Sequence, residues 1–166
     1  TTMEIEYNLY HGITVNGSFL PWGISREEAR AKLNLPFRAD DQVMDFSEFG
    51  MDTVIEQKRD IYGDMAQGGH YIFLGYDSES DLSECELHLF DSFRIGDVTL
   101  HHAQPMEEVL DLLATQSQIR NETGYELFEF PALKMSVASS QGMGGDEGDD
   151  GLSYIYMAAN VDHWQQ

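Results

Sequence analysis

The first residues of the chain alternate between apolar and polar side chains. In residues 3–9, MEIEYNL, every second position is apolar and the positions between them are polar. Because successive side chains of a strand point to opposite faces, this pattern predicts a half-buried β-strand. Strand character continues over residues 12–20 around Asn16-Gly17, a dipeptide typical of tight hairpin turns.

The segment SREEARAKLNLP, residues 25–36, changes to a helical pattern. Ser25 and Glu28 have the spacing of a capping box at a helix N-terminus. An alanine and a leucine four residues apart supply a buried face. Pro36 ends the helix, and Asn34 suits the left-handed backbone conformation at its C-terminus.

The rest of the chain predicts a second helix and further strands. The clearest strand covers residues 83–90, in which Cys85, Leu87 and Leu89 alternate with polar residues. The second helix begins at Pro105, a residue that suits the first helical turn. Its apolar stripe consists of Met106, Val109, Leu110 and Leu113. The other strands are expected at 52–62, 69–76, 93–100, 124–130, 133–139 and 152–159.

The sequence shows a repeated pattern when it is aligned with itself at a shift of 80 residues. This shift places Val15 on Ile95, Leu20 on Leu100, Glu27 on Glu107, Glu28 on Glu108, Ala29 on Val109 and Leu33 on Leu113. A shift of 83 residues places YIFL (71–74) over YIYM (154–157). We therefore expect an α+β fold: an antiparallel sheet or sheets with two helices packed on one face. The pattern predicts a single domain, 3–166, with tandem strand–helix–sheet repeats at 11–90 and 91–164.

The charge of the chain gives information on its binding partner. The chain carries 9 Lys and Arg against 30 Asp and Glu, a net charge of −21. Most of the excess lies after residue 60, where the basic residues are Arg94, Arg120 and Lys134. Such a chain repels nucleic acid and anionic membranes and attracts a basic protein. Solubility is the other interpretation of the same charge.

The segment GMGGDEGDDG, residues 142–151, concentrates this charge between two predicted strands. An EF-hand calcium loop requires a bidentate Glu at the twelfth position, and no carboxylate stands there. The segment is therefore expected to be a long hairpin loop. It is either an acidic contact loop for a basic surface or solvated and disordered.

Catalytic chemistry is weakly represented in the sequence. His101-His102 match no standard metal spacing, and neighbouring residues of a strand point to opposite faces. Cys85 alternates with leucines, which favours a core residue over a nucleophile. P-loop, Rossmann and nucleophile-elbow motifs do not occur. We therefore expect neither an enzyme nor a cofactor or metal site.

The residues GISREEARAKLNLPF (23–37) resemble the helix opening of the beta-lactamase-inhibitory-protein-like fold and of small outer-membrane assembly lipoproteins. The usual pattern there ends in leucine-glycine-x-proline. Asn34 replaces the glycine, and asparagine tolerates the same backbone conformation. The second copy lacks this ending. The resemblance implies tandem units and protein binding by a concave sheet. By its acidity and α+β pattern, the chain also resembles immunity proteins of bacterial polymorphic toxin systems.

We therefore expect a bacterial, acidic inhibitor that occludes a basic toxin domain and binds neither nucleic acid nor membrane. The single cysteine and the absence of a signal-peptide pattern predict a cytoplasmic protein. Alternatives are a nucleic-acid mimic that inhibits a DNA-binding enzyme, a metal- or small-ligand-binding enzyme, or a housekeeping domain. The oligomeric state stays open. The predicted partner-binding residues are Asp146, Glu147, Asp149 and Asp150 for steering, Glu84, Glu86 and His88 on one strand face, and Tyr154, Tyr156 and Trp22 as anchors.

Overall fold

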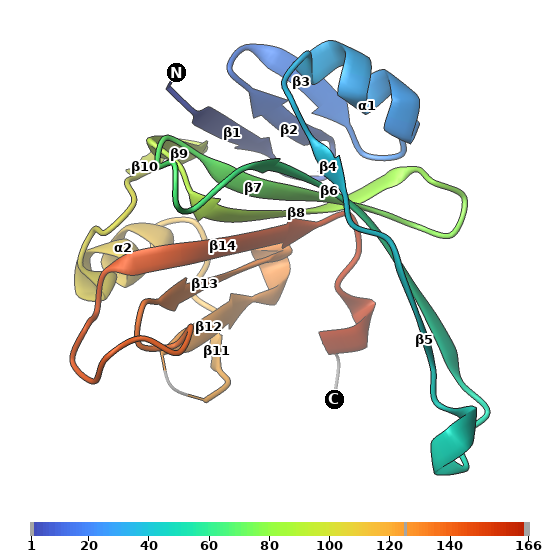
Figure 1. Cartoon of the computed structure of the whole chain (residues 1–166). Helices are drawn as coiled ribbons and strands as arrows, with labels where there is room; N and C mark the ends of the chain where they lie inside the picture. Colours follow the sequence, from blue (N-terminus) through green and yellow to red (C-terminus); the bar gives the residue numbers. More distant parts are fainter. Residues whose placement is uncertain (1, 125, 165–166) are drawn as a thin grey trace.

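Two β-sheets lie against each other across the main apolar core (Figure 1). The computed structural model describes residues 2–124 and 126–164. Within these residues the strand pairs are antiparallel, except that β1 and β9 pair in parallel. With two α-helices beside the sheets, the fold is α+β, as the sequence predicts.

The smaller sheet has five strands in the order β10-β9-β1-β2-β3. Their bounds are β1 Glu4–Asn8, β2 Gly12–Val15, β3 Ser18–Pro21, β9 Ser92–Ile95 and β10 Val98–Leu100. The period-two pattern at the N-terminus forms β1, whose Ile5 and Tyr7 are buried. Asn16 and Gly17 have positive φ angles of 48° and 87° and close the β2–β3 hairpin, as their sequence predicts.

The larger sheet has nine strands in the order β11-β12-β13-β14-β8-β7-β6-β4, and β5 pairs with β6. Their bounds are β4 Arg38–Ala39, β5 Gln42–Asp45, β6 Val54–Gly63, β7 Tyr71–Tyr76, β8 Leu82–Leu89, β11 Asn121–Glu122, β12 Leu127–Phe130, β13 Met135–Ser139 and β14 Leu152–Ala158. Segments far apart in the sequence meet at its centre, where β8 pairs with β14.

Two sequence expectations differ from the structure. The single strand predicted at 93–100 is a hairpin of β9 and β10, which turns at Gly96 with a φ of 57°. Residues 37–51 carried no predicted element, yet β5 and the short helix η1 (Ser47–Phe49) lie there. Together with β6 they form a long hairpin that leaves the body of the protein (Figure 1). Its strands lack the buried-and-exposed alternation that a sequence pattern can detect.

The first helix follows its predicted capping. α1 spans Arg26–Leu33, and the Ser25 hydroxyl accepts a hydrogen bond from the Glu28 backbone N–H. Asn34 ends the helix in the left-handed conformation, with a φ of 50°. α2 spans Met106–Leu113 and buries three residues of its predicted stripe, Met106, Val109 and Leu113. α1 contacts β3 and α2 contacts β10, the two edge strands of the smaller sheet.

A buried ion cluster attaches α1 to the larger sheet. Asp60 of β6 is fully buried, and its carboxylate accepts hydrogen bonds from Arg26 at 2.7 Å and Arg30 at 2.8 Å. The Tyr76 hydroxyl also donates a hydrogen bond to this carboxylate, at 3.2 Å. Burial alone would raise the pKa of Asp60, but the hydrogen bonds from Arg30 and Arg26 outweigh it and lower that pKa. A buried carboxylate thus stays charged because two arginines surround it.

Candidate protein-binding face

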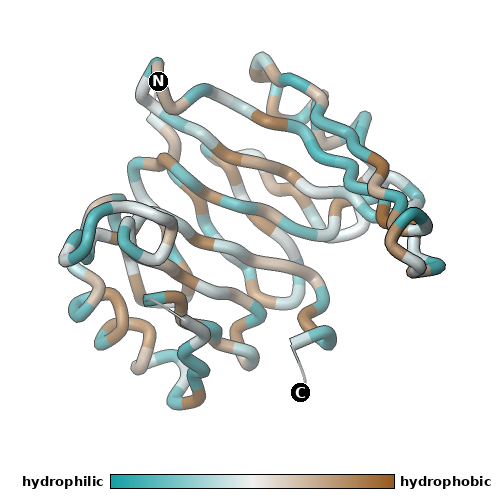
Figure 2. Tube along the Cα trace, turned by 60° about the horizontal axis from the view of Figure 1, so that its bottom comes forward, coloured by the Kyte–Doolittle hydropathy of each residue, from teal (hydrophilic) through white to brown (hydrophobic). Residues whose placement is uncertain are grey.

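One face of the nine-stranded sheet is turned away from the smaller sheet and carries polar and aromatic side chains. We call it the outer face (Figure 2). It arises from alternation: Cys85 and Leu87 of β8 and Ile155 of β14 enter the core, so their neighbours point outward. The centre of the outer face consists of Arg59, Tyr71, Phe73, Glu84, Glu86, His88, Tyr154 and Tyr156.

Two tyrosine–glutamate pairs occupy the seam between β14 and β8. The Tyr154 hydroxyl donates to Glu86 at 2.8 Å, and the Tyr156 hydroxyl donates to Glu84 at 2.5 Å. Burial first, and then the neighbouring carboxylates, raise the pKa of both tyrosines. The hydroxyls therefore stay protonated and hold the carboxylates in place without neutralising their charge.

Gly75 of β7 provides the space for Glu84. The two residues are paired across the strands, and a Cβ atom on Gly75 would lie 2.4 Å from Cγ of Glu84. A side chain at position 75 would therefore displace Glu84 from the sheet surface. The glycine fixes where this carboxylate lies.

Arg59 of β6 lies beside the glutamates. One guanidinium nitrogen is 2.6 Å from Asp40, and another is 3.9 Å from Glu86. The guanidinium also lies over the Phe73 ring, 4.6 Å from its centroid. Arg59 is therefore bound more closely to Asp40 than to Glu86.

His88 sits in an aromatic cluster at the end of β8. Its ring centroid is 4.5 Å from that of Phe73, 5.2 Å from Tyr154 and 5.6 Å from Tyr71. Burial first, and then the charge of Arg59, lower the pKa of His88 to about 4. His88 is thus neutral at pH 7 and adds no positive charge to the outer face.

The acidic loop, residues 142–151, reaches this cluster from the side. Asp146 and Asp149 line a shallow depression together with His88 and Met143. The loop is built from hydrogen-bonded turns: the Gly145 N–H donates to the Ser140 carbonyl and the Gln141 N–H to the Asp149 carbonyl, while the Gln141 side-chain oxygen accepts from the Gly148 N–H. The carbonyl of Asp150 accepts from the Met106 N–H at the start of α2, and Glu147 is exposed.

The sheet thus brings together five of the predicted contact residues, Glu84, Glu86, His88, Tyr154 and Tyr156, with two loop acids beside them. Trp22 is elsewhere: it is half-buried between β3 and α1 and packs against the core. Sequence reasoning missed Arg59, Tyr71 and Phe73 as members of the face. Trp164 also lies next to the face, with its ring centroid 6.0 Å from that of Tyr156.

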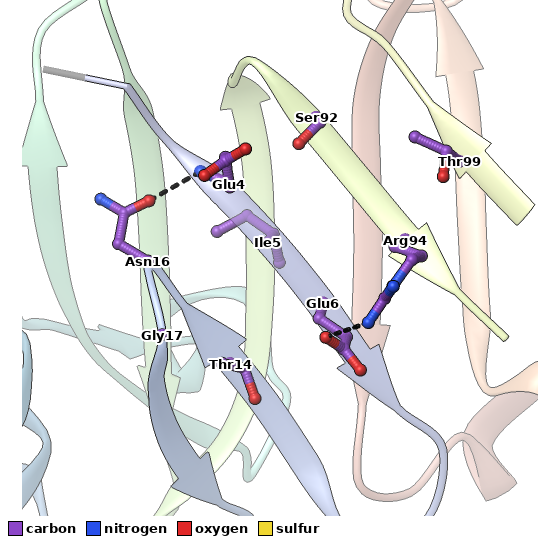
Figure 3. Close-up of a pocket in the computed structure, with 9 residues that line it drawn as sticks. All are labelled: Glu4, Ile5, Glu6, Thr14, Asn16, Gly17, Ser92, Arg94 and Thr99. Atoms are coloured by element: carbon purple, nitrogen blue, oxygen red, sulfur yellow. Dashed lines mark hydrogen bonds and ion pairs between the residues drawn. The ribbon is translucent and has the colours of Figure 1, made fainter. Parts of the chain in front are cut away.

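A second depression lies on the outside of the five-stranded sheet (Figure 3). The Asn16 side chain accepts a hydrogen bond from the Glu4 backbone N–H, and Arg94 donates to Glu6 at 2.6 Å. Glu6 and Arg94 are paired across the parallel strands β1 and β9. These contacts are those of a solvated sheet surface on which Glu6 and Arg94 form an ion pair.

Metal, thiol and membrane-spanning sites concern the described residues, 2–124 and 126–164. In this part of the chain no three His, Cys, Asp or Glu side chains are grouped so that they could hold a metal ion. Cys85 is fully buried, and burial raises the pKa of its thiol. No helix in the same residues is long and apolar enough to cross a membrane.

No protein-family model, curated protein or solved structure matches the chain. The functional interpretation therefore rests on the geometry of the outer face and on the charge of the chain.

Proposed function

We propose that the protein is an acidic inhibitor, of the immunity-protein type, that binds a basic toxin domain with its outer face. Binding would cover the active or substrate-binding surface of that domain. The observation that carries the proposal is the pair of glutamates, Glu84 and Glu86, that tyrosine hydroxyls hold in place on an open sheet.

Ordered carboxylates favour binding of arginine and lysine. A carboxylate that is already held in one conformation loses little entropy when it accepts a charge-assisted hydrogen bond. Neutral donors such as Tyr154 and Tyr156 order the carboxylate but leave its charge for the partner. Tyrosines also supply large contact areas, and they are enriched at protein interfaces.

Charge supports the choice of a basic partner. At a net −21, the chain attracts a cationic protein over a distance and raises its rate of association. Asp146 and Asp149 extend this charge to the edge of the outer face, next to His88. The bacterial cytoplasm is the proposed compartment, with one cysteine, Cys85, that has no disulfide partner.

We further infer that the chain consists of two tandem units, each with a hairpin, a helix and three strands. The two helices begin 80 residues apart, at Arg26 and Met106, and each follows a two-stranded hairpin. Strands β6, β7 and β8 then follow one another from one side of the larger sheet to its centre, and β12, β13 and β14 do so from the other side, so that β8 and β14 meet. This order favours β8, rather than the similar segment YIFL of β7, as the counterpart of β14.

The proposal is tested by recovering the partner. The tagged protein is used to capture binding proteins from a lysate of its native host at low and at high salt, and mass spectrometry identifies them. We expect one basic protein, lost at high salt, whose toxicity in cells is suppressed by co-expression of this chain. A housekeeping DNA-binding enzyme would instead support nucleic-acid mimicry. Recovery of no basic protein would contradict the proposal.

A further inference from the structure

The hairpin of β5, η1 and β6 exposes an unusual amount of apolar surface. We call residues 42–57 the arm. Phe49 at its tip is 76% exposed, and Val43 is 69% exposed. Half of the twelve exposed large apolar residues in the described chain lie in the arm: Val43, Met44, Phe49, Met51, Val54 and Ile55. Such a concentration marks an interaction site, whereas scattered apolar residues need no explanation.

Both faces of the arm are apolar. The register pairs Met44 with Ile55 on one face, while Val43 and Val54 lie on the other. An isolated two-stranded ribbon is only marginally stable in water, and no residue of the arm is buried. The arm therefore contributes little to the core, and its apolar side chains are available to another molecule.

Charge decides which molecule fits. The arm carries four acids and no lysine or arginine; the acids are Asp45, Glu48, Asp52 and Glu56. An anionic membrane would repel these acids, and so would the arm of a second copy of the chain. A protein surface with an apolar depression surrounded by lysine and arginine satisfies both the apolar and the acidic side chains.

The base of the arm is joined to the outer face. Asp40 binds Arg59 of the outer face, which approaches Glu86, while Asp41 accepts two hydrogen bonds, at 2.8 Å and 2.9 Å, from Arg26 of α1 on the inner side of the sheet. In Figure 1 the arm leaves the larger sheet and projects away from the five-stranded sheet. A molecule that lies on the outer face therefore meets the arm at its side.

We propose that the arm is a second contact site for the basic protein bound by the outer face, and that Phe49 and Met51 enter an apolar depression on it. Asp45, Glu48 and Asp52 contact lysine and arginine side chains around that depression. This inference rests on the proposed function, because it takes the partner to be a basic protein. It adds exposed aliphatic and phenylalanine side chains to the polar and aromatic side chains of the outer face.

The experiment uses a library of disulfide-closed random peptides displayed on phage, with the full-length protein as bait. A second bait has residues 43–56 replaced by Asn-Gly, so that Gln42 and Gln57 stay paired across a two-residue turn. Peptides that bind the first bait and not the second are sequenced and synthesised. Their dissociation constants are then measured against wild type, Phe49→Ser and the matched control Phe19→Ser, which changes an exposed phenylalanine of β3.

We expect the arm-dependent peptides to combine lysine or arginine with aromatic or aliphatic residues. Phe49→Ser should weaken their binding about tenfold or more, and Phe19→Ser less than about twofold. Neutral or acidic arm-dependent peptides, or none at all, would overturn the inference. Arm-dependent binding to phosphatidylglycerol vesicles, or an arm-dependent dimer in sedimentation velocity, would overturn it as well.

The same selection separates the two proposals. One outcome is that basic peptides bind both baits equally but fail to bind the variant Glu84→Gln/Glu86→Gln. This result would support the outer face as the binding site and overturn the inference about the arm. If neither bait selects basic peptides, the proposed function fails together with the inference.

Discussion

The nine-stranded sheet carries carboxylates on both of its faces, and their surroundings differ. On the inner face, Asp60 is fully buried between Arg26 and Arg30, so its charge is balanced within the protein. On the outer face, Glu84 and Glu86 accept hydrogen bonds from neutral tyrosines, and Arg59, 3.9 Å from Glu86, is bound more closely to Asp40. The first arrangement holds a helix to the sheet, and the second presents negative charge in a fixed position. Carboxylates of the same sheet thus serve structure on one side and, as we propose, recognition on the other.

Removal of the inner carboxylate should have the largest effect on stability. Asp60→Ala leaves two arginines next to a buried, uncharged position, which is expected to lower the free energy of unfolding by about 3–5 kcal/mol. Urea denaturation followed by circular dichroism measures this change. The matched variant Glu84→Ala, on the outer face, should cost less than about 1 kcal/mol. Equal losses for the two variants would show that the faces do not differ in this way.

His88 should make the outer face sensitive to mild acid. Its pKa is lowered from 6.5 to about 4 in the folded protein, so the unfolded chain takes up a proton at higher pH than the folded one does. Stability should therefore fall as the pH drops from about 6.5 to about 4, by roughly 1–2 kcal/mol after solvent screening. His88→Gln should flatten this part of the profile. An unchanged pH dependence in this variant would rule out His88 as its source.

The tyrosine hydroxyls should matter less for stability than for binding. Tyr156→Phe removes the donor to Glu84 and should lower the free energy of unfolding by about 1 kcal/mol. The carboxylate becomes free to rotate, so affinity for the basic partner should fall several-fold. Calorimetric titration of the recovered partner measures the affinity. An unchanged affinity would mean that the tyrosine does not prepare Glu84 for binding.

The acidic loop should have the smallest effect on stability. Replacement of its four acids by amides should change the free energy of unfolding by less than about 0.5 kcal/mol, because these side chains are exposed. Association with the basic partner should slow several-fold and depend less on salt. Stopped-flow measurements over a range of salt concentrations test this. An association rate equal to wild type would exclude the loop from steering.

Local patterns account for much of what could be predicted. The alternation in β8 and β14 places Glu84, Glu86 and Tyr154 outward, and the capping residues of α1 bound its helix. Pairing of β14 with β8 joins residues about 70 positions apart, and a local pattern carries no information about such a contact. Local patterns therefore predict that these side chains point outward, but they do not predict that the two strands are neighbours.

Two features of the molecule could not be predicted from the local pattern of the sequence. Asp60 follows a lysine and an arginine and resembles part of a solvated strand, because the arginines that bury it belong to a helix 30 residues earlier. The arm combines apolar and acidic residues without the period of a half-buried strand. The contacts that bury Asp60 are tertiary, and the contacts that we propose for the arm are with another molecule.

The central claim is that the outer face binds a basic partner because its carboxylates lie in fixed positions, and not only because the chain is acidic overall. The most direct measurement compares two variants that lose the same charge, Glu84→Gln/Glu86→Gln on the outer face and Glu27→Gln/Glu28→Gln on the exposed side of α1. Affinity for the recovered basic protein should fall about tenfold or more in the first and less than about twofold in the second. Equal losses in the two variants would contradict the claim and leave only overall acidity as the source of binding.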